Sequence, residues 1–178
     1  MIKIINDFLP KTFNNKIKED IKEGRLAFYY REGNVDNSKL SQFTHLCYLK
    51  NDNVQSSDYF NVISPMLYFI EKEFNLAIIE LEKLKINIIT SKHLANKDLD
   101  TALHKDEEDS SFLSFLYYVN SADGDTCFYN TDGTILQKVT PKENTGVLFN
   151  SNILHRATPP LNTDARIVIN VVFKANDS

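Results

Sequence analysis

The second half of this 178-residue chain is a succession of short runs rich in β-branched and aromatic residues. The breaks between them read SADGD, TDG, PKENTG and PPLNTD, all combinations of turn-forming residues. Many short strands at such spacing are typical of an antiparallel sandwich or barrel. The predicted strands are Leu84–Thr90, Phe112–Val119, Thr126–Tyr129, Ile135–Val139, Gly146–Phe149, Ile153–Ala157 and Arg166–Phe173.

Two helices are expected before this β-rich region. The first spans roughly Pro10 to Glu23, and Gly24 is a natural stop. The second is capped by Ser64, begins at Pro65 and continues to about Lys83, because an apolar stripe at spacings of three or four runs through Ile78 to Leu81. Strands are predicted around Leu26–Tyr30 and Phe43–Leu49.

The sequence therefore predicts a mainly β protein with N-terminal helices, in a single domain over residues 1–178. Residues 1–83 would form a helical and β buttress, and residues 84–175 the β core. No repeat or linker divides the chain. The net charge of −4 leaves no basic footprint for nucleic acid, and no apolar run is long enough to span a bilayer. A start without a signal-peptide pattern, and only two cysteines, predict a cytoplasmic protein.

One group of residues has the composition of a metal site. His104 and Asp106 are two apart, so on an extended segment their side chains point to the same face. His155 follows on another predicted strand. Two imidazoles and one carboxylate on one face of iron form the facial triad, which leaves positions open for a co-substrate and dioxygen. An HxD spacing alone is weak evidence, and a lone strand histidine is more often structural.

Arg166 strengthens this interpretation. It opens the last apolar strand, RIVINVVF, eleven residues after His155. An inward-facing guanidinium at a strand start is suited to a dicarboxylate, although such a residue can also be a solvated charge at the strand end. If Arg166 faces the barrel interior, so do Val168 and Asn170. Asn170 would then be either a polar group in the pocket or a satisfied buried amide.

From Lys85 to Phe173 the chain resembles the prolyl-hydroxylase-like branch of the 2-oxoglutarate/Fe(II) dioxygenases. The shared features are, in order, HKD, FLYYVN at 115–120, GDTCFY at 124–129, VTPKENTGVLFNSNILHRATPP and RIVINVVF. The resemblance implies a double-stranded β-helix, or jelly roll, braced by helices. It implies Fe(II), 2-oxoglutarate and O2 as cofactor and co-substrates, and ascorbate as reductant.

The resemblance also implies a role for each matching residue. His104, Asp106 and His155 occupy the iron-ligand positions, and Arg166 that of the basic residue that pairs with the distal carboxylate of 2-oxoglutarate. Tyr118 matches a tyrosine that hydrogen-bonds that carboxylate in some members. The family-level expectation is hydroxylation of a peptidyl proline, another protein side chain or a small molecule by a monomer or homodimer.

The chain departs from the family pattern in two places. Asp125 replaces a glycine of the GGET sequence that prolyl hydroxylases often carry, and Asn87, Ile88 and Ile89 stand where many members have a tyrosine. These departures put the prolyl substrate in doubt. Two alternatives also stay open: a cupin-like metal enzyme that does not use 2-oxoglutarate, and a non-catalytic binding module.

The remaining chemistry-bearing residues have simpler interpretations. His45 is expected to be packed or hydrogen-bonded, and His93 to be solvated in a loop that can border the iron site. Cys47 and Cys127 are expected to be buried thiols. The acidic run at 107–111 is usually a solvated loop, but at the pocket mouth it would favour a cationic substrate.

Overall fold

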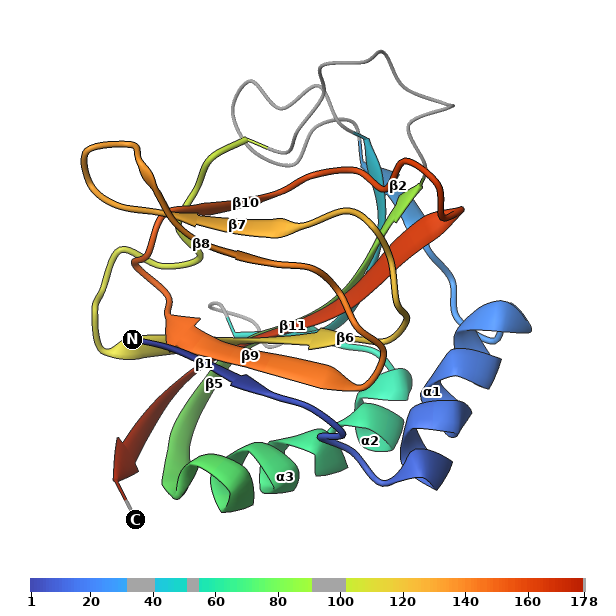
Figure 1. The fold of residues 1–178 in the computed structure, drawn as a ribbon. Helices are drawn as coiled ribbons and strands as arrows, with labels where there is room; N and C mark the ends of the chain where they lie inside the picture. Colours follow the sequence, from blue (N-terminus) through green and yellow to red (C-terminus); the bar gives the residue numbers. More distant parts are fainter. Residues whose placement is uncertain (32–40, 51–54, 91–101, 178) are drawn as a thin grey trace.

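The computed structural model describes residues 1–31, 41–50, 55–90 and 102–177. In these residues, the strands form two antiparallel sheets that face each other, and the helices lie on the outer side of the larger sheet (Figure 1). The elements are, in order, β1 (Ile2–Ile5), α1 (Lys11–Lys22), β2 (Tyr29–Arg31), β3 (Gln42–Leu49), β4 (Gln55–Ser56), α2 (Tyr59–Ile63), α3 (Pro65–Phe74), β5 (Leu76–Thr90), β6 (Phe112–Tyr118), β7 (Thr126–Tyr129), β8 (Ile135–Val139), β9 (Thr145–Asn150), β10 (His155–Ala157) and β11 (Ala165–Asp177).

The large sheet has the order β1-β9-β6-β11-β5-β3-β2, with β4 on β3, and the small sheet has the order β10-β7-β8. Each predicted strand of the second half is present, which confirms the mainly β fold with N-terminal helices. The edge strand β1 was not predicted. Its residues alternate poorly, and only pairing of Ile2 with Phe149 and Ile5 with Gly146 makes it a strand.

The boundary between the second helix and the following strand was predicted wrongly. The helix ends at Phe74, not at Lys83, because Asn75 adopts a left-handed conformation (φ 53°) that reverses the chain. Ile78 and Leu81 belong instead to β5, where Leu81 lies opposite Phe173 and Leu76 opposite Asp177 of β11. Local periodicity allowed either structure, and pairing with the chain's last strand decided between them.

The other helix signals had mixed outcomes. α1 matches its predicted span, and Gly24 follows it at a positive φ of 69°. Pro65 occupies the first turn of α3, as predicted. Ser64 makes no capping hydrogen bond through its side chain, because it is itself helical and follows α2 directly.

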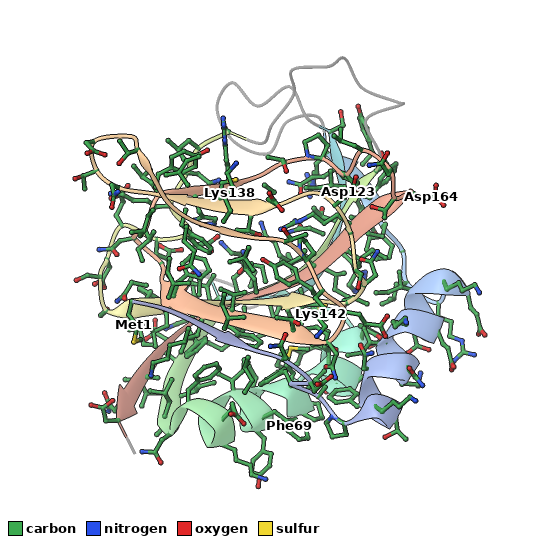
Figure 2. All side chains as sticks on the ribbon, viewed as in Figure 1. Met1, Phe69, Asp123, Lys138, Lys142 and Asp164 are labelled. Atoms are coloured by element: carbon green, nitrogen blue, oxygen red, sulfur yellow. The ribbon has the colours of Figure 1, made fainter. Side chains whose placement is uncertain are left out.

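Two apolar layers hold the sheets and helices together, and Figure 2 shows side chains filling both spaces. The first lies between the large sheet and the helices, and includes Tyr117 and Phe115. The second lies between the two sheets and includes Tyr118, Phe128 and Phe149. Consecutive strand residues point to opposite faces, so Tyr117 packs toward the helices and Tyr118 toward the second sheet.

The histidine and the two cysteines that were expected to have structural roles are buried in the fold. His45 is buried, with Nδ1 2.8 Å from the Ala27 carbonyl and Nε2 2.9 Å from the Ser57 hydroxyl. Cys47 and Cys127 are buried thiols that are not joined in a disulfide. His93 lies outside the described residues. In the described part of the chain, no helix is long and apolar enough to cross a membrane.

Candidate active site

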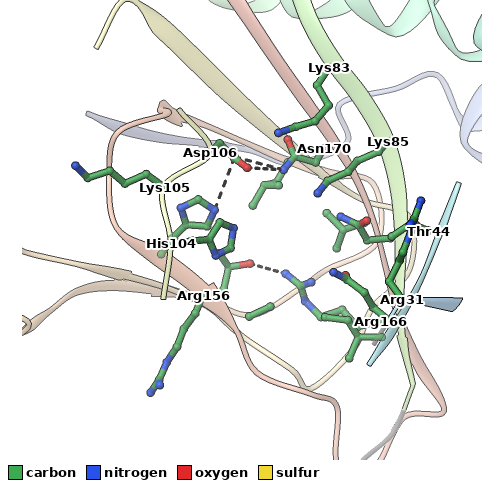
Figure 3. A pocket seen from close by; sticks show the side chains of 18 of the residues that line it. Arg31, Thr44, Lys83, Lys85, His104, Lys105, Asp106, Arg156, Arg166 and Asn170 are labelled. Carbon is green, nitrogen blue, oxygen red and sulfur yellow. Dashed lines mark hydrogen bonds and ion pairs between the residues drawn. The ribbon is translucent and has the colours of Figure 1, made fainter. Parts of the chain in front are cut away.

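A cavity of about 400 Å³ lies between the two sheets. Strands β3, β5 and β11 supply one wall, and β10 with the segment around His104 supplies another (Figure 3). Five of the six residues predicted for the site line this cavity: His104, Asp106, His155, Arg166 and Asn170. The sixth, Tyr118, lies just behind its surface.

The segment that carries His104 and Asp106 is held beside the segment that ends at His155. His104 and His155 exchange two backbone hydrogen bonds of 3.0 and 2.9 Å, and the Asp106 amide donates to the Ser151 carbonyl at 3.0 Å. This antiparallel pairing places side chains 49 residues apart in sequence next to each other. The prediction that the HxD residues lie on an extended segment agrees with this pairing.

The three side chains have the arrangement of a divalent-metal site. Their potential ligand atoms all lie within 4.8 Å of one another. The Nδ1 atoms of His104 and His155 are each 2.9 Å from a carbonyl two residues earlier, Ala102 and Ile153. When Nδ1–H donates to these carbonyls, each Nε2 keeps a free lone pair for a metal. This donor set is suited to Fe(II).

Neighbouring polar groups orient the Asp106 carboxylate. The Ser114 hydroxyl donates to Oδ2 at 2.7 Å, and the Asn170 amide lies 3.1 and 3.3 Å from the two oxygens. The Ser114 hydroxyl is also 2.8 Å from that of Ser151. Strand alternation had placed Asn170 on the interior face, but nothing in the sequence showed that Ser114 and Asn170 would both reach Asp106.

The same surroundings keep the site in its metal-binding protonation state. Burial lowers the pKa of His104 to about 4. Burial alone would raise the pKa of Asp106, but the neighbouring His155 ring, the positive charges of Lys83 and Lys85 and the Ser114 hydrogen bond lower it to about 2. At neutral pH His104 is therefore neutral and Asp106 ionised.

Arg166 lies at the other end of the cavity, four residues along β11 from Asn170. Its Nε donates to the Gly124 carbonyl at 3.0 Å, and one terminal nitrogen donates to the Thr126 hydroxyl at 2.6 Å. The Tyr118 hydroxyl lies 2.8 Å from the same Thr126 oxygen. Thr126 therefore stands between Tyr118 and the cavity, a contact that sequence reasoning missed.

Gly124 makes this arrangement possible. A Cβ at this position would come within 2.4 Å of the Thr158 carbonyl oxygen and 2.8 Å of the Pro160 nitrogen. The close approach of the two segments therefore requires glycine. Asp125, the departure from the family pattern, has its own partners: its amide donates to Thr158 and its carboxylate accepts from Thr140.

The cavity is strongly cationic. Six of its lining side chains are lysine or arginine, and Asp106 is its one carboxylate among the described residues. The acidic residues 107–111 do not line it. Glu108 pairs with Lys105 at 2.6 Å and Asp109 with Lys174 at 3.4 Å. A cationic substrate was expected only if this run rimmed the pocket, and the cavity lining does not include it.

Comparison with known proteins agrees with this geometry. The pattern of the 2OG-Fe(II) oxygenase superfamily matches residues 87–174, a range that contains all six predicted site residues. The chain belongs to the 2OG-Fe(II) oxygenase superfamily. It is accordingly an oxidoreductase that uses Fe(II), 2-oxoglutarate and O2, and its resemblance to the prolyl-hydroxylase-like members is confirmed. No curated protein matches this oxygenase in sequence.

Solved structures share the fold of this oxygenase at low sequence identity. A prolyl hydroxylase from Trichoplax adhaerens, in complex with a hypoxia inducible factor peptide fragment, has a TM-score of 0.69 at 16% identity, covering 97% of this chain and 83% of that one. A Pseudomonas putida prolyl-4-hydroxylase has a TM-score of 0.60 at 14%, covering 97% and 92%. HygX from Streptomyces hygroscopicus, with nickel, 2-oxoglutarate and hygromycin B, has a TM-score of 0.64 at 11%, covering 97% and 82%.

Proposed function

We propose that this oxygenase binds iron through His104, Asp106 and His155 and hydroxylates a substrate in the cavity beside them. The observation that carries the proposal is the convergence of these three ligand atoms at one end of a cavity that has Arg166 at its other end. Bound Fe(II) would supply the redox chemistry by which 2-oxoglutarate and O2 are converted to succinate, carbon dioxide and a hydroxylated product. Ascorbate would serve as the reductant.

Arg166 anchors the distal carboxylate of 2-oxoglutarate in this proposal. Its buried guanidinium stays charged, and hydrogen bonds to Gly124 and Thr126 hold it in place. The Thr126 hydroxyl is the natural second donor to the carboxylate, with the Tyr118 hydroxyl donating to Thr126 in turn. Tyr118 thus acts as a positioning residue, and the co-substrate meets Arg166 and Thr126.

The carboxylate of Asp106 favours hydroxylation over halogenation. Related halogenases lack this ligand, which leaves a position for chloride. Asn170 and Ser114 keep the carboxylate oriented and ionised, so that position is filled. The substrate class remains the family-level proposal of a peptidyl proline, another protein side chain or a small molecule. Two observations on similar proteins support this range: the peptide held by the Trichoplax enzyme and the hygromycin B held by HygX.

The test is Fe(II)-dependent formation of succinate from 2-oxoglutarate, measured without added substrate and with ascorbate present. Succinate should form with the wild-type protein and be lost in His104→Ala and Asp106→Ala. Glu73→Ala, an exposed change on α3, is the matched control and should keep the wild-type rate. Circular dichroism verifies that each variant is folded.

Two results would overturn parts of the proposal. Turnover that persists in both ligand variants would mean that iron binds elsewhere. Metal binding without any effect of 2-oxoglutarate on the metal's spectrum would favour a cupin-like enzyme that does not use this co-substrate. The product is then sought as the addition of one oxygen atom, by mass spectrometry of a lysate incubated with the enzyme.

A further inference from the structure

The cationic side chains of the cavity are not all accounted for by 2-oxoglutarate. Arg166 is the anchor for its distal carboxylate. Lys105 forms an ion pair with Glu108, and Arg156 lies over the ring of Tyr129, 5.4 Å from its centroid. Figure 3 shows both of these side chains directed away from the centre of the cavity. Arg31 is exposed at the cavity's edge, which leaves Lys83 and Lys85.

Lys83 and Lys85 project from one face of β5, because alternate residues of a strand point the same way. Figure 3 shows both ammonium groups directed toward the cavity, on the side of Asn170. Among the described residues, no carboxylate lies within ion-pair distance of either lysine. Lys83 and Lys85 act electrostatically on Asp106, and Lys83 also on Glu107, but neither lysine makes a direct ion pair in the part of the chain that the structure describes.

The strand register separates this lysine pair from Arg166. Lys85 lies opposite Asn170 of β11, whereas Arg166 lies opposite Ile89. Four residues along a strand correspond to roughly 13 Å between Cα atoms. The lysine pair thus lies at the metal end of the cavity, away from the end that holds the distal carboxylate.

The charges at this end do not balance when the oxygenase is loaded. Fe(II), Lys83 and Lys85 would bring four positive charges here, against two negative charges from Asp106 and the 2-oxo carboxylate of 2-oxoglutarate. Two partly buried ammonium groups beside a cation repel one another and the metal, and an anion relieves both interactions. The surplus positive charge is therefore a binding determinant for a further anion.

A nearby buried acceptor points to a ligand in the same place. The Asn87 Oδ1 is buried and has no hydrogen-bond partner among the described residues. Asn87 lies two residues from Lys85 on the same face of β5, beside Thr44 of β3. An unsatisfied buried acceptor is costly unless a bound group donates to it. A matching substrate would carry an oxyanion for the two ammonium groups and a nearby N–H or O–H that donates to the Asn87 Oδ1.

We propose that Lys83 and Lys85 form a second anion site, which binds a carboxylate or phosphate of the primary substrate next to the metal. This inference rests on the proposed function, since it takes the anion to be part of the molecule that the oxygenase hydroxylates. It deepens that function by defining the substrate as an anion. The alternative of an uncharged or cationic substrate predicts no anion binding here.

The test uses fluorine NMR of three small probes: trifluoroacetate for a carboxylate, monofluorophosphate for a phosphate, and trifluoroacetamide as the neutral analogue. Each probe is titrated into protein loaded with Mn(II), a redox-inactive stand-in for Fe(II), and excess 2-oxoglutarate. An anion held by Lys83 and Lys85 lies close to Mn(II), so its fluorine relaxation should be strongly enhanced. The preferred probe identifies the source of the anion.

The variant Lys83→Gln/Lys85→Gln should weaken binding of the preferred anion by about tenfold, the usual loss for a charged hydrogen bond. Lys83→Arg/Lys85→Arg retains both charges and should retain binding. Lys138→Gln/Lys142→Gln removes two exposed lysines outside the cavity (Figure 2) and should leave binding unchanged. Equal enhancement of the neutral probe, or unchanged binding in the double glutamine variant, would overturn the proposal.

A metal-free arm separates this inference from the proposed function. Line broadening of the same anionic probes is compared between wild-type and Lys83→Gln/Lys85→Gln protein without metal. A lysine-dependent difference supports the anion site even if Mn(II) or 2-oxoglutarate fails to bind, which would count against the oxygenase proposal alone. No difference in either arm overturns the anion site while leaving metal-dependent turnover as a separate result.

Discussion

The side-chain amide of Asn170 lies 3.1 Å and 3.3 Å from the two carboxylate oxygens of Asp106. The two residues are 64 positions apart in sequence, and strand β11 places Asn170 next to Asp106. The amide donates to a buried carboxylate that must stay ionised to hold a metal. Asn170 thus supports a proposed metal ligand without being a ligand itself.

Asn170→Ala should lower the affinity for Fe(II) or Mn(II) by about tenfold, which is typical when a group that orients a metal ligand is lost. Asp106 would keep the Ser114 hydrogen bond, so binding should be weakened and not abolished. Metal titration by water-proton relaxation measures the effect. Asn176→Ala, at the exposed end of the same strand, is the control. Unchanged affinity would show that the Asn170 contact is merely structural.

Thr126→Val should raise the KM for 2-oxoglutarate by about tenfold, because Arg166 and Tyr118 both lose their shared hydroxyl partner. The change conserves volume, so kcat should change little. Thr126→Ser restores the hydroxyl and should restore the KM. The measurement is succinate formation across 2-oxoglutarate concentrations. If Thr126→Val keeps the wild-type KM, the anchor consists of Arg166 alone.

Lys85 provides a pH-dependent test in metal-free protein. Burial, together with the charge of Lys83, lowers its pKa from 10.5 to about 8. Below pH 8, Lys85 is protonated in both the folded and the unfolded protein, so folding carries the full free-energy cost of burying its charge. Between pH 8 and 10.5 only the unfolded state keeps it, so the free energy of unfolding rises with pH.

Lys85→Met removes this cost and should stabilise the metal-free protein at neutral pH by about 1 kcal/mol. This is less than the lowered pKa of Lys85 alone implies, because the side chain is only half-buried and solvent screens part of its charge. The advantage should shrink as the pH rises toward 10. Urea unfolding of wild type and variant at each pH measures the difference, with exposed Lys138→Met as the control. A pH-independent difference would contradict a lowered pKa for Lys85.

The left-handed Asn75 is the point where helix α3 gives way to strand β5. Asn75→Ala should destabilise the fold by about 1 kcal/mol, since a Cβ without a local polar partner disfavours positive φ. Asn75→Gly tolerates the conformation and should be closer to wild type. Thermal unfolding measures both. If alanine were neutral, the chain reversal at Asn75 would not be what ends the helix.

The sequence by itself determined the strand succession and most of the site. Turn residues bound each run from Phe112 onward, and strand alternation placed Arg166 and Asn170 on one face. These properties are local, because period-two alternation and turn chemistry depend on neighbouring residues only.

Only the tertiary structure decided the rest, because the remaining contacts join distant segments. The residues from Leu76 to Lys83 had the periodicity of a helix, but pairing with the end of β11 made them strand. That strand in turn directs Lys83 and Lys85 into the cavity. The same holds for two contacts of the site: the hydrogen bonds of Thr126 with Tyr118 and Arg166, and that of Asn170 with Asp106. Both depend on how distant segments pack together, which no local pattern encodes.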